Sequence, residues 1–251
     1  MPWTLAYTQH CGNNPDQQDA LWSGLAIYQR RDLAPLQHSS DGDEVFAAVA
    51  DGVANSPAPQ RASRIVLESL AADIAAGRTF NASLLRRAHG RLCDALARGR
   101  SYGSAATLTA AACRGDRCTV VSVGDSRAYR IAADGRWEQI TRDHTILNRL
   151  IDEGVAEDGV AYAGFYGMLD SCLTADDADI DFAIHYSTVA LRPGDALLLC
   201  TDGVHDTLGE QLAALFDHGA KALAQVQRWR EVILALGAPD NFSLVLIERT
   251  A

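Results

Sequence analysis

Five aspartates lie at or near the ends of short apolar runs in this chain. Asp51 ends the run V-F-A-A-V-A-D, Asp125 ends T-V-V-S-V-G-D, and Asp202 follows L-L-L-C-T. Asp240 precedes a further apolar run, and Asp206 comes four residues after Asp202. One such junction usually marks only a turn, because Asp and Gly are common turn residues. Several carboxylates gathered together repel one another unless divalent cations neutralise them, and Mg²⁺ and Mn²⁺ prefer oxygen ligands. The repetition therefore indicates a site for hard cations.

Apolar runs and apolar residues at helical spacing predict the elements that position these acids. An amphipathic helix is expected over residues 62–74, with Ser56 as its cap, Pro57 at its first position and Gly77 at its end. The other expected helices are 83–98, 144–153, 211–216 and 220–236. The expected strands are 5–8, 21–28, 45–50, 104–113, 118–123, 128–132, 137–141, 182–191, 197–200 and 242–247.

The order of these elements predicts the fold class. Strands outnumber helices, and the helices come in adjacent pairs instead of alternating with single strands, which favours antiparallel sheets covered by helices. The strands between residues 104 and 141 are joined by G-D and D-G turns and are expected to form one antiparallel meander. No internal repeat, low-complexity tract or linker interrupts the chain, so we expect an α+β fold in a single domain over residues 1–251.

The composition is that of a globular protein with an acidic balance. The 251 residues are 48% hydrophobic and carry a formal net charge of -10 at pH 7, which disfavours nonspecific binding to nucleic acid or an anionic membrane. The six cysteines show no C-x-x-C spacing, and several lie in apolar runs, where Cys acts as a small buried hydrophobe. This usage fits a reducing compartment, and no signal peptide or membrane span is evident, so a cytoplasmic protein is expected.

Seven short motifs resemble those of the metal-dependent protein Ser/Thr phosphatases of type 2C (the PPM family), and the resemblance covers nearly the whole chain. They are D-Q-Q-D-A (16–20), V-A-D-G (49–52), G-S-A-A-T (103–107), V-G-D-S-R-A-Y (123–129), T-R-D-H-T (141–145), L-L-L-C-T-D-G-V-H-D (197–206) and P-D-N-F-S (239–243). Each motif alone is weak evidence, but all seven occur in the family's order. The resemblance implies a bacterial-type, four-layer α-β-β-α sandwich of two antiparallel sheets flanked by helix pairs.

The resemblance also implies a binuclear metal centre of Mn²⁺ or Mg²⁺. In this chain Asp51 would bridge the two ions, with the Gly52 carbonyl on one of them and Asp202 and Asp240 on the other. These three aspartates are the expected catalytic residues. Paired cations of this kind activate a water for in-line attack on a phosphate and neutralise its oxygens.

Further residues are implied around that centre. Asp125 and Asp206, together with Asp202, match the third, weaker ion site of bacterial members. Asp19 and Asn241 match residues that orient waters or metal ligands.

The chain departs from the family's pattern where the substrate phosphate is held. Asn14 stands where the family usually has a phosphate-gripping Arg, and Gln18 stands where it has a Glu that contacts a metal through water. An Asn binds phosphate more weakly than a bidentate Arg, and Arg61 or Arg142 are candidates to replace it. Residues 150–177 correspond to the family's variable flap beside the active site.

Three functions remain open from the sequence. The first is a protein Ser/Thr phosphatase of signal transduction, acting as a monomer on phosphoproteins, with a Ser/Thr kinase or its targets as partners. The second is a catalytically impaired homologue that regulates by binding phosphoproteins or a kinase, which the Asn14 and Gln18 departures suggest. The third is a phosphatase of small phosphate esters. His144 and His205 lie near the motifs and could act as general acids. We interpret them as structural histidines in preference to that role.

Overall fold

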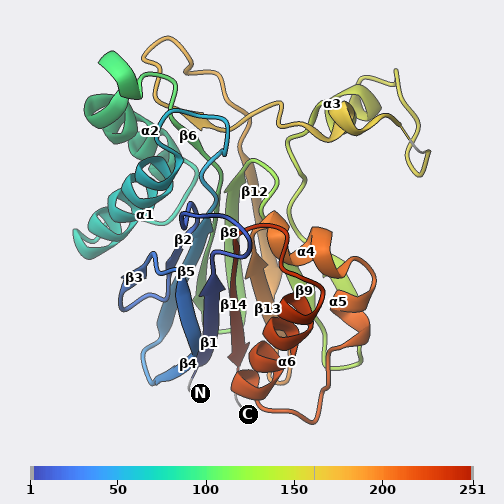
Figure 1. Cartoon of the computed structure of the whole chain (residues 1–251). Helices are drawn as coiled ribbons and strands as arrows, with labels where there is room; N and C mark the ends of the chain where they lie inside the picture. The colour runs from blue at the N-terminus through green and yellow to red at the C-terminus, as the bar shows by residue number, and fades with distance from the viewer. Residues whose placement is uncertain (1–2, 161, 250–251) are drawn as a thin grey trace.

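The computed structural model describes residues 3–160 and 162–249. Two six-stranded antiparallel sheets form its centre (Figure 1). Sheet 1 has the order β10 (Trp137–Gln139), β9 (Arg127–Ile131), β13 (Ala196–Cys200), β14 (Phe242–Arg249), β1 (Trp3–His10), β4 (Asp32–Ser40). Sheet 2 has the order β12 (His185–Ala190), β8 (Arg117–Val123), β7 (Leu108–Arg114), β5 (Glu44–Ala50), β2 (Ala20–Trp22), β3 (Ile27–Tyr28). A small sheet pairs β11 (Leu173–Thr174) with β6 (Ala105–Ala106).

Helices cover the outer face of each sheet, which makes the four-layer α-β-β-α arrangement that was predicted (Figure 1). Sheet 2 carries α1 (Pro59–Ala75) and α2 (Ser83–Leu96), and sheet 1 carries α4 (Asp202–Leu208), α5 (Gln211–Ala214) and α6 (Ala222–Ala235). The helix α3 (Ile146–Asp152) and the 3₁₀ turns Gly99–Ser101 and Gly164–Gly167 complete the elements. Within the described ranges, no helix reaches the length and apolarity that crossing a bilayer needs.

Continuous apolar runs form the strands because both faces of each sheet are covered. In β5, Ala48 and Ala50 face α1 and α2, whereas Val45, Ala47 and Val49 face sheet 1. Side chains alternate between the two faces of a strand, so neither face tolerates a charge. Each large side chain buried this way contributes about 1.5–3 kcal/mol. The rigid layers that result position the loops at the strand ends.

The predicted meander is wrong, because its strands divide between the two sheets. β7 and β8 belong to sheet 2, β9 and β10 belong to sheet 1, and the chain crosses between the sheets at residues 124–126. Gly124 has a φ of +97°, and a Cβ there would lie 2.6 Å from Cγ2 of Thr107. Only glycine fits this crossing. The crossing carries Asp125, which therefore lies between the two sheets.

The predicted start of the first long helix is also wrong. α1 begins at Pro59 after Ala58, two residues later than the expected Pro57 after Ser56. The Ser56 hydroxyl does not cap the helix; it accepts a hydrogen bond from the backbone N–H of Ala105 at 3.1 Å. Proline is still the first helical residue, because the N–H that it lacks would have no partner there.

The elements that were not predicted are β4, α4, β11 and the two 3₁₀ turns, and the expected strand 21–28 is divided into β2 and β3. The strand β4 contains Pro35 and many polar residues, and it lies at the edge of sheet 1, where a missing N–H can face outward. The helix α4 begins at Asp202, directly after β13, where a turn was expected. The residue before it, Thr201, is of a type common at helix starts, but its hydroxyl donates to Asp19 instead of capping the helix.

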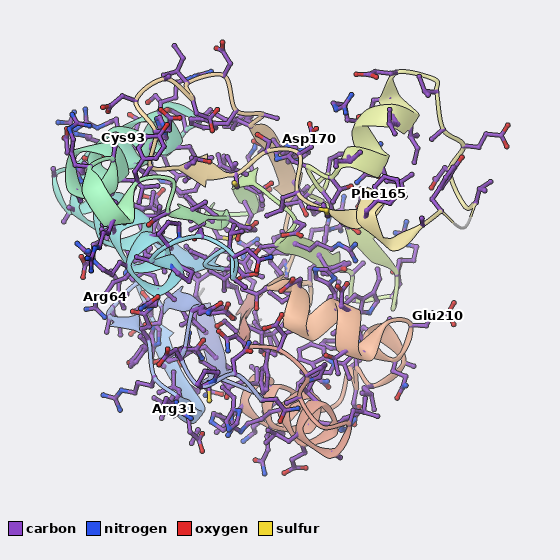
Figure 2. All side chains as sticks on the ribbon, turned by 45° about the horizontal axis from the view of Figure 1, so that its top comes forward. Arg31, Arg64, Cys93, Phe165, Asp170 and Glu210 are labelled. Carbon is purple, nitrogen blue, oxygen red and sulfur yellow. A yellow bond between two sulfur atoms is a disulfide. The ribbon has the colours of Figure 1, made fainter. Side chains whose placement is uncertain are left out.

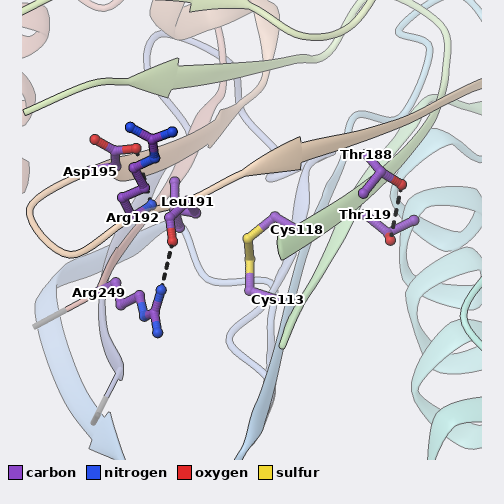
Figure 3. The surroundings of a disulfide bond; sticks show 8 residues. All are labelled: Cys113, Cys118, Thr119, Thr188, Leu191, Arg192, Asp195 and Arg249. Atoms are coloured by element: carbon purple, nitrogen blue, oxygen red, sulfur yellow. Dashed lines mark hydrogen bonds between the residues drawn. A yellow bond between two sulfur atoms is a disulfide. The ribbon is translucent and has the colours of Figure 1, made fainter. Parts of the chain in front are cut away.

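Two cysteines form a disulfide that the sequence analysis did not predict. Cys113 and Cys118 are opposite each other in β7 and β8, and their sulfur atoms are bonded in the core between the sheets (Figure 3). Both side chains are fully buried, as the apolar runs around them predict, but they are not free thiols, and a disulfide does not support the expected reducing compartment. The free cysteines are Cys11, Cys93, Cys172 and Cys200.

Candidate metal centre

The acids singled out in the sequence come from both sheets and meet at one end of the sandwich. Asp51 follows β5 of sheet 2, and Asp202 follows β13 of sheet 1. Their carboxyl groups lie close enough to shift each other's pKa. Asp240 stands before β14, and Asp125 lies on the crossing between the sheets. The structure therefore brings together side chains that are far apart in the sequence.

Burial and mutual repulsion raise the pKa values of these carboxyl groups. Burial, followed by the charges of Asp202, Asp19 and Asp125, holds the pKa of Asp51 well above its ordinary value. Burial and then the charge of Asp202 raise the pKa of Asp125 to about 7. The pKa of Asp202 is raised by burial and then by Asp240. No Lys or Arg is among the causes of these shifts, so the cluster is a concentration of negative charge.

Asp19 lies fully buried behind this cluster. Its Oδ2 atom accepts hydrogen bonds from Oγ1 of Thr201 at 2.9 Å and from Oγ of Ser243 at 2.8 Å. Burial, followed by the charge of Asp202, raises the pKa of Asp19 to about 7. The two hydroxyl donors were missed as functional residues. The available signal was a hydroxyl at the end of one apolar run and another inside the next, where a polar group needs a partner.

Asn241 fixes the loop that leads to Asp19. Its side-chain oxygen accepts from the backbone N–H of Gln18 at 2.7 Å, and its Nδ2 donates to the carbonyl of Cys11 at 2.7 Å. Asn14 lies on the same loop, and its Nδ2 donates to Oδ1 of Asp240 at 2.6 Å. The residue that replaces the expected phosphate-gripping Arg therefore contacts one of the expected metal ligands.

The glycines after two of the aspartates are required by close backbone contacts. A Cβ on Gly203 would lie 1.9 Å from the carbonyl oxygen of Asn241, and one on Gly52 would lie 2.4 Å from the carbonyl oxygen of Pro59. Both clashes involve backbone atoms, which cannot move aside cheaply. The repeated Asp-Gly pairs thus reflect tight packing at the site as well as turn formation.

The two histidines hold the crossing that carries Asp125. His144 Nδ1 accepts a hydrogen bond from the N–H of Gly124 at 3.0 Å, and His205 Nε2 lies 3.2 Å from the carbonyl oxygen of Asp125. His205 Nδ1 is 2.9 Å from Oδ1 of Asp206, and this contact holds the pKa of Asp206 below its ordinary value. These contacts are those of structural histidines.

A pocket of about 240 Å³ opens beside the cluster. Asp206 lines its rim with a side chain that is 74% exposed, and the exposed Asp240 lies beside it. Asp202 and Gly203 line the pocket as well. The structure thus brings Asp202, Asp206 and Asp240 to one surface, with Asp51, Asp125 and Asp19 deeper in the cluster.

The donor set fits hard divalent cations. All the acidic donors are carboxylate oxygens, and Oδ1 of Asp19 and Oδ1 of Asp125 are buried without a hydrogen-bond partner. Within residues 3–160 and 162–249, no group of three or more His, Cys, Asp or Glu side chains is placed so that it could hold an ion by itself. Mg²⁺-type sites do not need such a group, because each ion keeps several waters and takes only one or two carboxylates.

The flap projects from the body of the sandwich, above the helices of sheet 1 (Figures 1 and 2). The described part of residues 150–177, without 161, holds the end of α3 and a 3₁₀ turn. Arg142 donates to Oδ1 of Asp152 at 2.6 Å and to the Asn148 carbonyl at 3.2 Å, so it braces α3. Arg149 pairs with Asp170 at 2.8 Å. Of the two candidate replacements for the missing Arg, Arg142 is thus already engaged.

The comparisons with known proteins agree on one family. A model of the family "Protein phosphatase 2C" matches residues 29–235. The serine/threonine protein phosphatase PstP of Mycobacterium tuberculosis is 28% identical over 233 residues, which are 88% of this chain and 44% of PstP, so the chain spans less than half of that relative. The catalytic domain of PstP solved with two manganese ions matches with a TM-score of 0.75 at 22% identity, over 100% of both chains. The PPM Ser-Thr phosphatase MsPP of Mycobacterium smegmatis, solved with cacodylate, matches with a TM-score of 0.76 at 26% identity, over 97% of each. These likenesses confirm the predicted fold.

Proposed function

Because this chain belongs to the protein phosphatase 2C family, we propose that it is a metal-dependent phosphatase that hydrolyses phosphoserine and phosphothreonine in proteins. The observation that carries the proposal is the convergence of Asp51, Asp125, Asp202 and Asp240, none of which forms a salt bridge with a Lys or Arg of the described chain; His205 is the basic group beside Asp125 and Asp202. The relative PstP, named as a serine/threonine protein phosphatase, supports the same activity.

The proposed ligands follow from the positions of the oxygen donors. Asp51, the Gly52 carbonyl, Asp202 and Asp240 would hold two Mn²⁺ or Mg²⁺ ions, and Asp125 and Asp206 with Asp202 would hold a third. When bound, such ions supply an acidified water and neutralise phosphate charge.

The chain's own groups keep the acids in position. Thr201 and Ser243 fix the Asp19 carboxyl, which lies against Asp51 and Asp202. Asn241 holds the loop that carries Gln18 and Asn14 against the start of β14. A site on rigid strand ends loses little orientation when a substrate arrives.

The contact between Asn14 and Asp240 supports the second candidate function, a catalytically impaired homologue that regulates by binding phosphoproteins or a kinase. Asn14 occupies an Oδ1 atom that a cation would need, and it has no guanidinium with which to grip a phosphate. A homologue impaired in this way would bind phosphoproteins without turning them over. The intact acids favour the enzyme, because carboxylates crowded together are costly unless cations bind them.

The deciding experiment measures hydrolysis of p-nitrophenyl phosphate with and without Mn²⁺. Wild type should turn over only with metal, Asp202→Asn should lose most of this turnover, and the exposed Asp134→Asn should behave like wild type. Absence of metal-dependent turnover in the wild type would favour the regulator. A phosphothreonine peptide hydrolysed faster than small phosphate esters would support the protein substrate, and the reverse order would favour a small-ester phosphatase.

We also propose that the protein is a cytoplasmic monomer whose partners are a Ser/Thr kinase or the proteins that it phosphorylates. Four free cysteines support a reducing compartment, whereas the disulfide between Cys113 and Cys118 favours an oxidising one. Cell fractionation tests the compartment, and sedimentation velocity tests the monomer.

A further inference from the structure

A second concave site lies at the opposite end of sheet 2 from the aspartates. It is a groove of about 690 Å³, larger than the pocket beside Asp202. Strand β5 begins at Glu44 on the groove and ends at Ala50 next to Asp51. Seven extended residues span roughly 20 Å, so the groove is remote from the proposed metal centre.

The groove exists because the helix pair covers only part of this sheet face. The face that packs under α1 and α2 continues past them to Phe46, Thr119, Tyr186 and Thr188. The Thr119 and Thr188 hydroxyls are 3.4 Å apart on neighbouring strands, on the side away from the disulfide (Figure 3). The α1–α2 connection supplies the wall, including Phe80.

Two exposed arginines line this groove and face each other across the β7–β8 turn. Arg114 and Arg117 are direct partners in the antiparallel register. Like charges in directly opposite positions destabilise a sheet. In the part of the chain that the structure describes, neither side chain makes an ion pair with a carboxylate. The two charges therefore have no evident structural purpose.

The charge balance of the groove is positive, although the chain as a whole carries -10. A third arginine, Arg78, lines the wall and is held by Asp73, which is buried. Glu44 is the acid among the lining residues, and it is the cross-strand neighbour of Arg114. Arg114 and Arg117 thus leave an excess of positive charge beside the exposed Tyr186 and the partly buried Phe46 and Phe80.

We propose that this groove is a docking site for an acidic, extended segment of a partner protein. A guanidinium binds carboxylates in a bidentate manner, so Arg114 and Arg117 suit neighbouring Asp or Glu side chains of a peptide. Phe46, Phe80 and Tyr186 offer apolar surface for side chains between those acids. The inference does not depend on catalysis, because it concerns binding at the far end of the sheet.

The test is fluorescence anisotropy with a labelled peptide rich in Glu and Asp with interspersed leucines. Wild type should bind it, and Arg114→Ala with Arg117→Ala should weaken binding by at least about tenfold. The control is Arg100→Ala with Arg136→Ala, which removes the same charge from exposed positions that do not line the groove. The control should bind like wild type. Added salt should weaken wild-type binding, because exposed charges are screened.

Several results would overturn the proposal. They are no binding by wild type, equal losses in the two double variants, or tighter binding of a single-stranded oligonucleotide than of the peptide. Folding is checked by thermal melting, in which Arg114→Ala with Arg117→Ala should match or exceed wild type because a like-charge pair is removed. Turnover of p-nitrophenyl phosphate by this variant should equal that of wild type, which separates a failure of docking from a failure of the catalytic proposal.

Discussion

Two regions of this molecule bury aspartate, and they treat its charge in opposite ways. Between α1 and α2, Asp73 is 1% exposed and accepts hydrogen bonds from Arg78, Arg87 and Arg91 at 3.2, 2.8 and 2.7 Å. Burial alone would raise the pKa of Asp73, but the hydrogen bond from Arg87 and the charges of the three arginines outweigh it and lower the pKa. At the strand ends, the pKa of Asp51 is instead raised.

The difference separates a structural charge from a functional one. In the helix pair, the chain itself supplies the counter-charge, so the ion pairs are complete once the protein folds. At the strand ends, the chain supplies carboxylates without a counter-charge, so neutralisation depends on cations from solution. We therefore expect the first region to govern stability and the second to govern activity and metal response.

The largest expected effect is on catalysis. Asp202→Asn should lower Mn²⁺-dependent turnover of p-nitrophenyl phosphate by about 10²–10³-fold, because one metal ligand accounts for several kcal/mol of charge stabilisation. Its melting temperature without metal should not fall, since the substitution removes a charge that raises the pKa of Asp51 and is itself repelled by Asp240. If Asp202→Asn kept its turnover but melted at a lower temperature than wild type, Asp202 would govern stability and not activity, which would contradict the expected difference between the two regions.

The next effect is stabilisation by metal. Mn²⁺ at a hundredfold excess over its dissociation constant should stabilise the wild type by about 2.7 kcal/mol, read as a rise in melting temperature. Asp202→Asn should respond less, whereas Asp73→Asn should respond as wild type does. Equal rises in melting temperature in all three proteins would mean that the cation binds at a site that does not include Asp202.

A smaller effect is expected in the helix pair. Asp73→Asn should destabilise the protein by about 1–3 kcal/mol in urea unfolding, because a charged acceptor of several hydrogen bonds is lost. The arginines are partly exposed and can turn to water, which limits the cost. The matched control is Asp94→Asn, an exposed position on α2 that should leave stability unchanged. Turnover should be unaffected in both.

The smallest expected effect is the pH dependence of the contribution that Asp73 makes to the free energy of unfolding. The pKa of Asp73 is lowered in the folded protein, so its stabilisation is fully present above the unfolded value and is lost as pH falls through the folded one. The stability difference between wild type and Asp73→Asn should therefore be constant near neutrality and shrink below about pH 4. Urea unfolding midpoints of both proteins across that pH range measure this stability difference. A difference that increased at low pH would contradict a lowered pKa of Asp73 in the folded protein.

Most of the fold was predictable because both faces of each sheet are buried, and such strands consist of continuous apolar residues. The elements that were not predicted lack a clear signal in the neighbouring residues of the sequence. β4 is an edge strand with few buried positions, and α4 starts without a capping bond. The division of β8 and β9 between sheets depends on one glycine conformation at Gly124, which a turn would also explain.

The site was predictable in its residue types but not in its contacts. The acids are marked by the apolar runs that they terminate. Sequence does not reveal that Asn14 donates to Asp240, or that Thr201 and Ser243 grip Asp19, since these pairs depend on three-dimensional packing. The groove is hidden for the same reason, because its residues come from alternate positions on several strands.

The pairing of β1 has a consequence for how the protein is made. β1 lies between β4 and β14, and β14 is the last strand of this chain. During synthesis β1 cannot pair along its second edge until residues 242–249 have emerged. Asp240 lies two residues before β14 and so emerges from the ribosome after Asp19, Asp51, Asp125 and Asp202. Until residues 240–249 have been made, sheet 1 therefore lacks the strand between β1 and β13, and the acid cluster lacks Asp240.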